Sequence, residues 1–286
     1  MSTPPPEIAA GTLYVVATPI GNLGDLSPRA LKILDGVDLI AAEDTRTTGA
    51  MLAHFGVRKK MIALHEHNEA EAAAEVIAQL KKDRSVALVS DAGTPLLSDP
   101  GYTLVQDARA AKIPVIAVPG PCAAIAALSI CGLPTDSFVF AGFLPVAELA
   151  RRQRIGVLAA ESRTVILYES THRVVETVEM LAELLGDRRV CLARELTKMF
   201  EESHTAGATD LLKWLRADEN RSRGEFVLLL EGAPETGASL REAERIVRIL
   251  HKEMGASRAA KLAAEITGLT KKELYPLAVK LGGDEE

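Results

Sequence analysis

The sequence predicts an α/β protein with mostly parallel strands, followed by a small helical region. Short apolar runs rich in branched residues alternate with segments that carry apolar residues at helical spacing, which is typical of a parallel sheet covered by helices. Beyond residue 233 only helical spacing remains. At 286 residues the chain is long enough for two domains with hydrophobic cores.

The elements follow one another in a regular order. The first strand is followed by a loop in which Ser27 caps a helix that begins with Pro28. Strands are predicted at residues 13–17, 39–42, 61–64, 85–89, 114–118, 138–143, 164–168, 189–193 and 225–232, and 201–206 could pair antiparallel with 189–193. Helices are predicted at residues 29–34, 47–55, 70–82, 102–111, 123–131, 174–185, 211–216, 240–254 and 257–267, with others beginning at 151 and 271.

Three loops at strand ends predict a small-molecule pocket. In residues 90–101, Gly93 and Gly101 allow backbone angles that other residues avoid, and prolines stiffen the chain. Residues 18–26 and 119–123 are similar loops after other strands, and ligands of open α/β sheets bind at this edge. An ordinary strand-to-helix turn is the alternative for each loop. The GxGxxG and P-loop fingerprints of nucleotide sites are absent.

Composition narrows the class of protein. The net charge of −6 argues against a globally basic nucleic-acid binder, although a local basic patch suffices for RNA contact. The three cysteines form no zinc spacing and suit a reducing cytoplasm. The longest apolar run, residues 122–133, is too short to span a bilayer, and the start has no signal-peptide pattern. We therefore expect a cytoplasmic protein without a membrane segment.

The predicted boundaries divide the chain into four parts. Residues 1–11 form a disordered lead-in, 12–121 an N-terminal α/β domain, 122–233 a second α/β domain and 234–286 a helical tail. The tail carries basic residues in a helix–turn–helix rhythm that could contact a phosphate backbone. Glutamates intersperse them, so a small bundle with solvated charged faces is the favoured alternative.

Motifs along the chain resemble the small-subunit ribosomal RNA (cytidine-2′-O)-methyltransferases of the tetrapyrrole methylase superfamily. The resemblance covers residues 13–232 or more. It rests on TPIGNL at 18–23, EDTR at 43–46, HEHN at 65–68, SDAGTP at 90–95 with SDPG at 98–101, PGP at 119–121, GLPT at 132–135, GFLP at 142–145 and RELTK at 194–198. Two positions depart from the family pattern. Cys122 replaces a serine, and Thr171 replaces a proline, which should loosen its loop.

The resemblance implies an S-adenosyl-L-methionine-dependent enzyme, usually a homodimer, with a deep cleft between two α/β domains. Its expected reaction is 2′-O-methylation of a cytidine ribose in 16S ribosomal RNA near the decoding centre. Expected cofactor contacts are Pro19, Gly21, Asn22, Gly93, Thr94, Pro95, Leu97, Cys122, Ala123, Tyr168 and Leu196. Turn or core packing is the alternative for each of them.

Methylation of a ribose requires that the 2′-hydroxyl is aligned with the activated methyl group and loses its proton to an acceptor. Polar residues at strand ends supply candidates: Asp44 or Glu195 as proton acceptor or orienter, and Arg46 and Lys198 to hold phosphate or stabilise charge. The alternative for Asp44 and Arg46 is an ion pair that holds a loop or makes a dimer contact.

Basic residues predict RNA contacts, because guanidinium groups match phosphate geometry. The candidates are His65, His67, Arg151, Arg152, Arg154, His172 and Arg173, with solvated helix residues as the alternative for the arginine run. The histidine pair is weak support for a metal site, and we expect none. Two other functions stay open: methylation of a tetrapyrrole or other small molecule, and a non-catalytic module that binds the cofactor or RNA.

Overall fold

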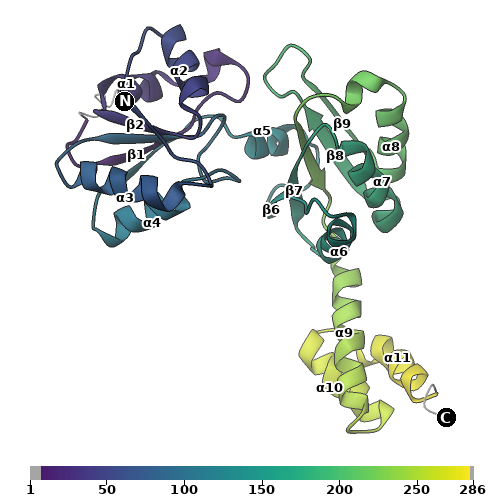
Figure 1. The fold of residues 1–286 in the computed structure, drawn as a ribbon. Helices are drawn as coiled ribbons and strands as arrows, with labels where there is room; N and C mark the ends of the chain where they lie inside the picture. Colours follow the sequence, from purple (N-terminus) through teal and green to yellow (C-terminus); the bar gives the residue numbers. More distant parts are fainter. Residues whose placement is uncertain (1–7, 284–286) are drawn as a thin grey trace, which may run out of the picture.

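The computed structural model describes residues 8–283, apart from the side chains of 235–241 and 281–283. Two α/β domains lie side by side and three helices extend from the second one (Figure 1). This confirms the predicted fold class. The predicted disordered lead-in falls mainly on residues 1–7, outside the described part. Within its remainder, the Ala9 N–H donates to the Tyr14 hydroxyl at 2.9 Å.

The first domain has one parallel sheet in the order β3-β2-β4-β1-β5. Its strands are β1 (Leu13–Val16), β2 (Leu39–Ala42), β3 (Met61–Ala63), β4 (Val86–Val89) and β5 (Val115–Val118). Its helices are η1 (Leu23–Asp25), α1 (Pro28–Gly36), α2 (Thr45–His54), α3 (Glu69–Leu80) and α4 (Tyr102–Ala110).

Helices cover both faces of this sheet. Alternate strand residues pack with α1 and α2 on one face and with α3 and α4 on the other. The inner strands β2 and β4 are buried at every position, which explains why they read as continuous apolar runs in the sequence. All five strands therefore end at the same edge, where the predicted ligand loops lie.

The second domain has a mixed sheet in the order β6-β7-β10-β8-β9. Its strands are β6 (Phe138–Phe143), β7 (Thr164–Glu169), β8 (Arg189–Arg194), β9 (Glu202–Gly207) and β10 (Phe226–Leu230). Its helices are α5 (Ala123–Ile130), α6 (Glu148–Leu158), α7 (Val174–Leu185), α8 (Ala208–Arg216) and η2 (Glu219–Ser222).

Only β6 and β7 pair in parallel in this sheet, and its other three pairs are antiparallel, so the expectation of mostly parallel strands is wrong here. The reason is the β8–β9 hairpin, after which the chain returns through α8 and enters β10 between β7 and β8. Helices α6, α7 and α8 cover one face of the sheet, and α5 covers the other. The end of β7 and the start of β10 thus lie at the same edge.

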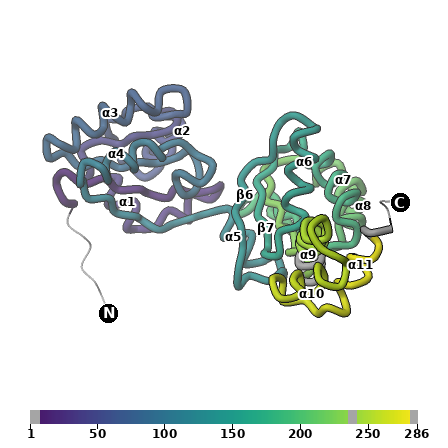
Figure 2. Tube along the Cα trace, turned by 90° about the horizontal axis from the view of Figure 1, so that it is seen from below, coloured from purple at the N-terminus to yellow at the C-terminus, as the bar shows by residue number. Residues whose placement is uncertain are grey.

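The C-terminal module consists of α9 (Glu235–His251), α10 (Ala256–Thr267) and α11 (Lys271–Gly283). Small and branched side chains, among them Ala243, Val247 and Ala263, form its core. It lies beside the second domain and away from the first (Figure 2). No helix in the described range has both the length and the apolar character needed to cross a membrane.

Candidate active site

A cavity of about 360 Å³ lies between the two α/β domains. This volume is within the range of small-molecule sites. Strand ends and loops of both sheets form its walls. That the cleft between the two domains is deep stays a prediction. The lining residues are Ile20, Glu43, Asp91, Ala92, Gly93, Thr94, Leu97, Asp99, Ala123, Phe143, Tyr168, Glu169, Ser170, Leu196, Glu225, Phe226 and Val227.

Hydrogen bonds tie the loops of the first domain into one wall. Thr18 and Gly93 exchange two backbone bonds of 2.9 and 3.1 Å, which join the loops after β1 and β4. The Thr94 hydroxyl donates to the Pro121 carbonyl at 3.0 Å and joins the loop after β5. Gly93 has a φ of +84°, a conformation that favours glycine. The wall is therefore held before any ligand arrives.

Two leucines of the cavity are held by unusual backbone. Leu97 lies between Leu96 and Ser98, and Leu196 lies between Glu195 and Thr197. The four flanking residues have φ values of 73°, 69°, 50° and 68°. Non-glycine residues in this region are uncommon and concentrate at functional sites. One leucine from each domain is thus presented to the cavity by a strained loop.

The first domain gives the cavity an acidic wall. Burial raises the pKa of Asp99 to about 6. A hydrogen bond from Ser90 opposes this increase, and the nearby charges of Glu43 and Asp91 add to it. Burial also raises the pKa of Glu43 and that of Asp91. None of the three forms a salt bridge with a described Lys or Arg. In contrast, Glu169 and Glu225, which also line the cavity, pair with Arg173 and Lys198.

The second domain contributes an aromatic wall. The ring of Tyr168 lies edge-to-face with Phe140 and Phe143, at centroid distances of 5.0 and 5.6 Å. Its hydroxyl accepts a bond of 3.2 Å from the Ala124 N–H at the start of α5. Burial raises the pKa of Tyr168 to about 12, so the hydroxyl keeps its proton. The wall suits a flat, partly apolar ligand group.

The predicted cofactor residues fall into two groups. Gly93, Thr94, Leu97, Ala123, Tyr168 and Leu196 line the cavity. The others lie within two residues of these lining residues or of Ile20, in the same loops: Pro19, Gly21, Asn22, Pro95 and Cys122. Cys122 precedes α5 as its N-cap, and its side chain forms no capping bond. The cofactor role of all these residues stays a prediction.

Asp44 and Arg46 form a local ion pair at the start of α2. Asp44 accepts bonds from the backbone and the guanidinium of Arg46, and these lower the pKa of Asp44 to about 2. A carboxylate with so low a pKa is a weak proton acceptor. The Arg46 side chain is 90% exposed. This geometry favours the alternative interpretation, in which the pair holds the loop beside Glu43 and Asp91.

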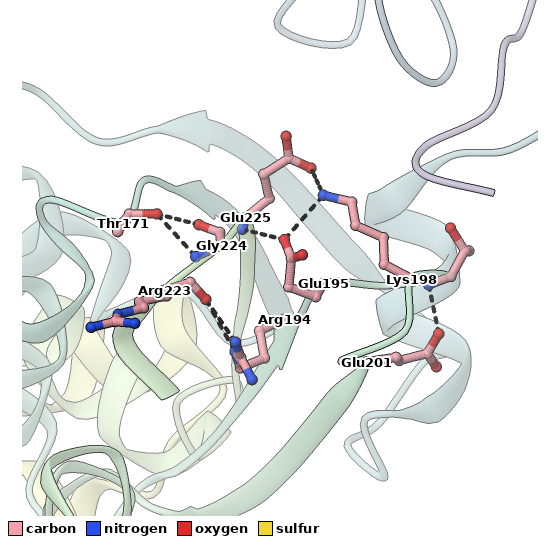
Figure 3. Close-up of polar contacts among 9 residues, drawn as sticks. Thr171, Arg194, Glu195, Lys198, Glu201, Arg223, Gly224 and Glu225 are labelled. Carbon is pink, nitrogen blue, oxygen red and sulfur yellow. Dashed lines mark hydrogen bonds and ion pairs between the residues drawn. The ribbon is translucent and has the colours of Figure 1, made fainter. Parts of the chain in front are cut away.

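Glu195, Lys198 and Glu225 form a network at the cavity edge (Figure 3). The Lys198 Nζ lies 3.0 Å from Glu195 Oε1 and 2.9 Å from Glu225 Oε2. Burial alone would raise the pKa of Glu195, but the Glu225 N–H and Lys198 lower it below its usual value. The Lys198 stem lies against Gly21 of the first domain, where an added Cβ would come within 2.6 Å of it. Lys198 thus connects the two domains.

The arginine run has three different environments on α6. Arg151 is 2% exposed, pairs with Glu176 and donates to the Val146 carbonyl. Its guanidinium is not accessible to a phosphate, so its predicted RNA contact is wrong. Arg152 pairs with Glu183, and Arg154 is exposed.

The remaining predicted RNA contacts differ in accessibility. Arg173 pairs with the buried Glu169 and donates to the Leu144 carbonyl, while His172 is exposed. His67 is exposed, and the buried Nδ1 of His65 has no hydrogen-bond partner. In the described part of the chain, no group of three or more His, Cys, Asp or Glu side chains could hold a metal ion.

Sequence reasoning missed several cavity residues, chiefly Asp91, Asp99, Phe143 and Glu225. Asp91 and Asp99 belong to motifs that carried the resemblance, but neither was named among the expected cofactor contacts or catalytic residues. The sequence did contain a signal for an acidic ligand site, since Asp91 and Asp99 lie on either side of the turn at Gly93. Glu225 could not be found in this way, because its position depends on the antiparallel entry of β10.

Comparison with known proteins shows which family this sequence resembles. Residues 12–212 match the family model described as Tetrapyrrole (Corrin/Porphyrin) Methylases, and 237–282 match the RsmI C-terminal HTH domain. Ribosomal RNA small subunit methyltransferase I of Escherichia coli O157:H7 is 50% identical over 275 residues, covering 96% of both chains. The protein of the same name from Xylella fastidiosa (strain Temecula1) is 52% identical over 277 residues, covering 96% of this chain and 99% of that one.

A solved structure shares the fold. Uroporphyrin-III C-methyl transferase from Thermus thermophilus, complexed with S-adenyl homocysteine, has a TM-score of 0.52 and 17% identity, covering 77% of this chain and 97% of that chain. The family models and the relatives at 50% and 52% identity confirm the sequence resemblance. The chain belongs to the tetrapyrrole methylase family and, within it, to the relatives named ribosomal RNA small subunit methyltransferase I.

Proposed function

We propose that this protein transfers a methyl group from S-adenosylmethionine to the 2′-hydroxyl of a cytidine ribose in small-subunit ribosomal RNA near the decoding centre. The observation that carries the proposal is the cavity between the domains, with an acidic wall opposite an aromatic one. Relatives of about the same length at 50% and 52% identity are named for methylation of this RNA.

The cavity fits the methyl donor. S-adenosylmethionine carries a positively charged sulfonium and an ammonium group. The carboxylates of Glu43, Asp91 and Asp99 line the cavity, and none of them forms a salt bridge with a lysine or arginine in the described part of the chain. They can therefore supply negative charge to this ligand. Its adenine is flat and partly apolar, which suits the side formed by Tyr168 and Leu196. When bound, this donor supplies an electrophilic methyl group.

The chain's own contribution is alignment and charge. The tied loops of the first domain fix the donor side, and the network of Glu195, Lys198 and Glu225 fixes the opposite edge. Alignment of the reacting atoms lowers the entropic part of the barrier. The hydroxyl proton must pass to an acceptor. Asp99 lines the cavity and has a raised pKa, so it is the better base, whereas Glu195 has a lowered pKa and orients Lys198, the positive charge at the cavity edge.

The tetrapyrrole alternative is weaker. Relatives at about 50% identity are named for ribosomal RNA, while the uroporphyrin enzyme is only 17% identical. The chain also carries the C-terminal module, in which Lys272 and Lys280 are exposed. We also propose a cytoplasmic location, because the proposed substrate is ribosomal RNA.

Methyl transfer tests the proposal. With labelled S-adenosylmethionine, the protein should label small ribosomal subunits that lack the modification, and it should not label a porphyrinoid. Labelling of the porphyrinoid alone would support the tetrapyrrole alternative. Cofactor binding without transfer to any subunit would support a non-catalytic module.

We also propose that the protein is a homodimer. Ile116 on the edge strand β5, Ile125 and Ile130 on α5, and Phe138 on the edge strand β6 are 39%, 50%, 48% and 40% exposed. They lie on the consecutive elements β5, α5 and β6, and Figure 1 shows α5 at the junction of the two domains. Exposed apolar residues gathered in this way are typical of a protein interface.

Replacing Ile125 and Ile130 with aspartate should give a monomer. Two charges within an apolar interface lose their hydration, so association becomes unfavourable. Sedimentation should give 30.6 kDa for the variant and twice that mass for the wild type. Val157→Asp is the control, since this residue is 64% exposed on α6. A monomeric wild type, or a variant that remains dimeric, would contradict the proposed interface.

A further inference from the structure

The segment Arg223–Gly224–Glu225 is held at all three of its residues, directly before β10 (Figure 3). The buried Arg194 guanidinium donates to the Arg223 carbonyl at 2.9 and 3.2 Å. The Thr171 hydroxyl donates to the Gly224 carbonyl and accepts from its N–H. The Glu225 N–H donates to Glu195 Oε1 at 3.0 Å. An exposed loop seldom has so complete a set of bonds.

Gly224 is required in this segment. Its φ is +104°, and an added Cβ would lie 2.5 Å from Glu195 Oε1. The glycine therefore lets the Glu195 carboxylate approach the segment and hold Glu225. The segment is fixed in a position that borders the cavity, because Glu225 lines it.

Thr171 has a different role from the expected one. A threonine in place of the family's proline should loosen its loop, but its hydroxyl makes two bonds to Gly224. A proline has no hydroxyl and could make neither bond. In this chain, Thr171 therefore connects the loop after β7 to the segment before β10.

The connection between Thr171 and Gly224 has a basic residue beside it on each segment. Strands β7 and β10 are antiparallel, with Phe226 opposite Glu169. Beyond this pairing, the two bonds between the Thr171 hydroxyl and Gly224 hold the loop after β7 beside the segment before β10. His172 follows Thr171 and Arg223 precedes Gly224, so each is one residue from this connection. Both Arg223 and His172 are exposed. Figure 3 shows the Arg223 side chain directed away from Lys198.

The other cations nearby are already paired. Arg173 pairs with Glu169, Arg194 and Arg221 pair with Glu202, and Lys198 pairs with two carboxylates. Within the described residues, Arg223 has no carboxylate partner, and its side-chain bond is to Asn220 Oδ1 at 3.5 Å. Arg223 is therefore the guanidinium at this edge that remains available to an anion.

We propose that Arg223 and His172 form a phosphate-binding rim for the RNA substrate, and that Thr171 is the positioning residue that holds this rim beside the cavity. The inference rests on the proposed function. A ribose whose 2′-hydroxyl enters the cavity carries a phosphodiester on its neighbouring 3′-oxygen, so a cation at the cavity edge meets the RNA backbone. The guanidinium offers paired N–H donors that match phosphate geometry, and the bonds to the Arg223 carbonyl fix the backbone that carries it.

The first test is RNA binding by Arg223→Ala. The dissociation constant for small-subunit ribosomal RNA should rise about tenfold, as expected for one charge-assisted phosphate contact. The slope of log affinity against log salt should become shallower by about 0.7 to 0.9. Affinity for S-adenosylmethionine should stay unchanged. Arg109→Ala is the matched control, because Arg109 is an exposed arginine at the end of α4, on the opposite edge of the first sheet.

The second test separates positioning from charge. Thr171→Val keeps every charge but removes both bonds to Gly224, so the KM for the RNA substrate should rise about threefold to tenfold with little change in melting temperature. Thr171→Ser keeps the hydroxyl and should restore the wild-type KM. Equal KM values for Val, Ser and wild type would overturn the role of Thr171.

The outcomes also separate this inference from the proposed function. A wild-type protein that methylates subunits, with Arg223→Ala unchanged in RNA affinity and salt slope, overturns the phosphate rim alone. A wild-type protein that neither binds nor methylates the RNA overturns both.

Discussion

Asp99→Asn lowers the affinity for S-adenosylmethionine by about tenfold to a hundredfold. The carboxylate lines the cavity, and no described lysine or arginine forms a salt bridge with it. Removing one charge next to a cationic ligand, in a partly buried site, costs a few kcal/mol. Isothermal titration at pH 8 measures the change. Asp107→Asn on α4 is the control, since Asp107 is exposed outside the cavity.

The pH dependence gives a second readout of the same residue. The pKa of Asp99 is raised to about 6, so its carboxylate is charged above that pH and takes up a proton below it. Wild-type affinity for the cofactor should therefore fall as pH decreases through about 6, and the Asn variant should lack this inflection. Equal affinities of the two proteins at pH 8 would contradict the role of the acidic wall.

Lys198→Met reduces the rate of methyl transfer about tenfold or more. Methionine keeps an apolar stem against Gly21 but leaves the Glu195 and Glu225 carboxylates without the ammonium between them. The two carboxylates then repel each other at the cavity edge, and the aligned geometry is lost. Single-turnover transfer to small subunits at saturating cofactor measures the effect.

Two further variants define what the result means. Lys82→Met, at an exposed site after α3, should behave as wild type. Asp44→Asn should stay within about threefold of wild type, because a carboxylate with a pKa of about 2 is a weak proton acceptor. A Lys198→Met enzyme with the wild-type single-turnover rate would remove this network from the mechanism.

The sequence predicts the wall formed by the first domain because its cause is local. Glycine and proline at strand ends determine turns directly, and parallel strands end at one edge, so the loops after β1, β4 and β5 had to meet. The loop of residues 90–101 and its Gly93 were found in this way, whereas Thr94 and Leu97 within it were named by the family resemblance. The same reasoning does not find Asp99, because its raised pKa depends on burial between domains and on Glu43 and Asp91.

The second domain is harder to predict because its contacts are long-range. The β8–β9 hairpin and the antiparallel entry of β10 determine that Glu225 reaches the cavity, and apolar periodicity alone does not specify strand direction. Arg151 shows the same limit. Its sequence context is basic, yet packing against α7 buries it beside Glu176.

Nucleoside analysis of the methylated RNA tests the central claim most directly. Small subunits from cells that lack this protein are incubated with it and labelled S-adenosylmethionine, and the RNA is digested to nucleosides. The proposed function predicts label in 2′-O-methylcytidine from the small-subunit RNA. Label in a base-methylated nucleoside, or no label in this RNA, would contradict it.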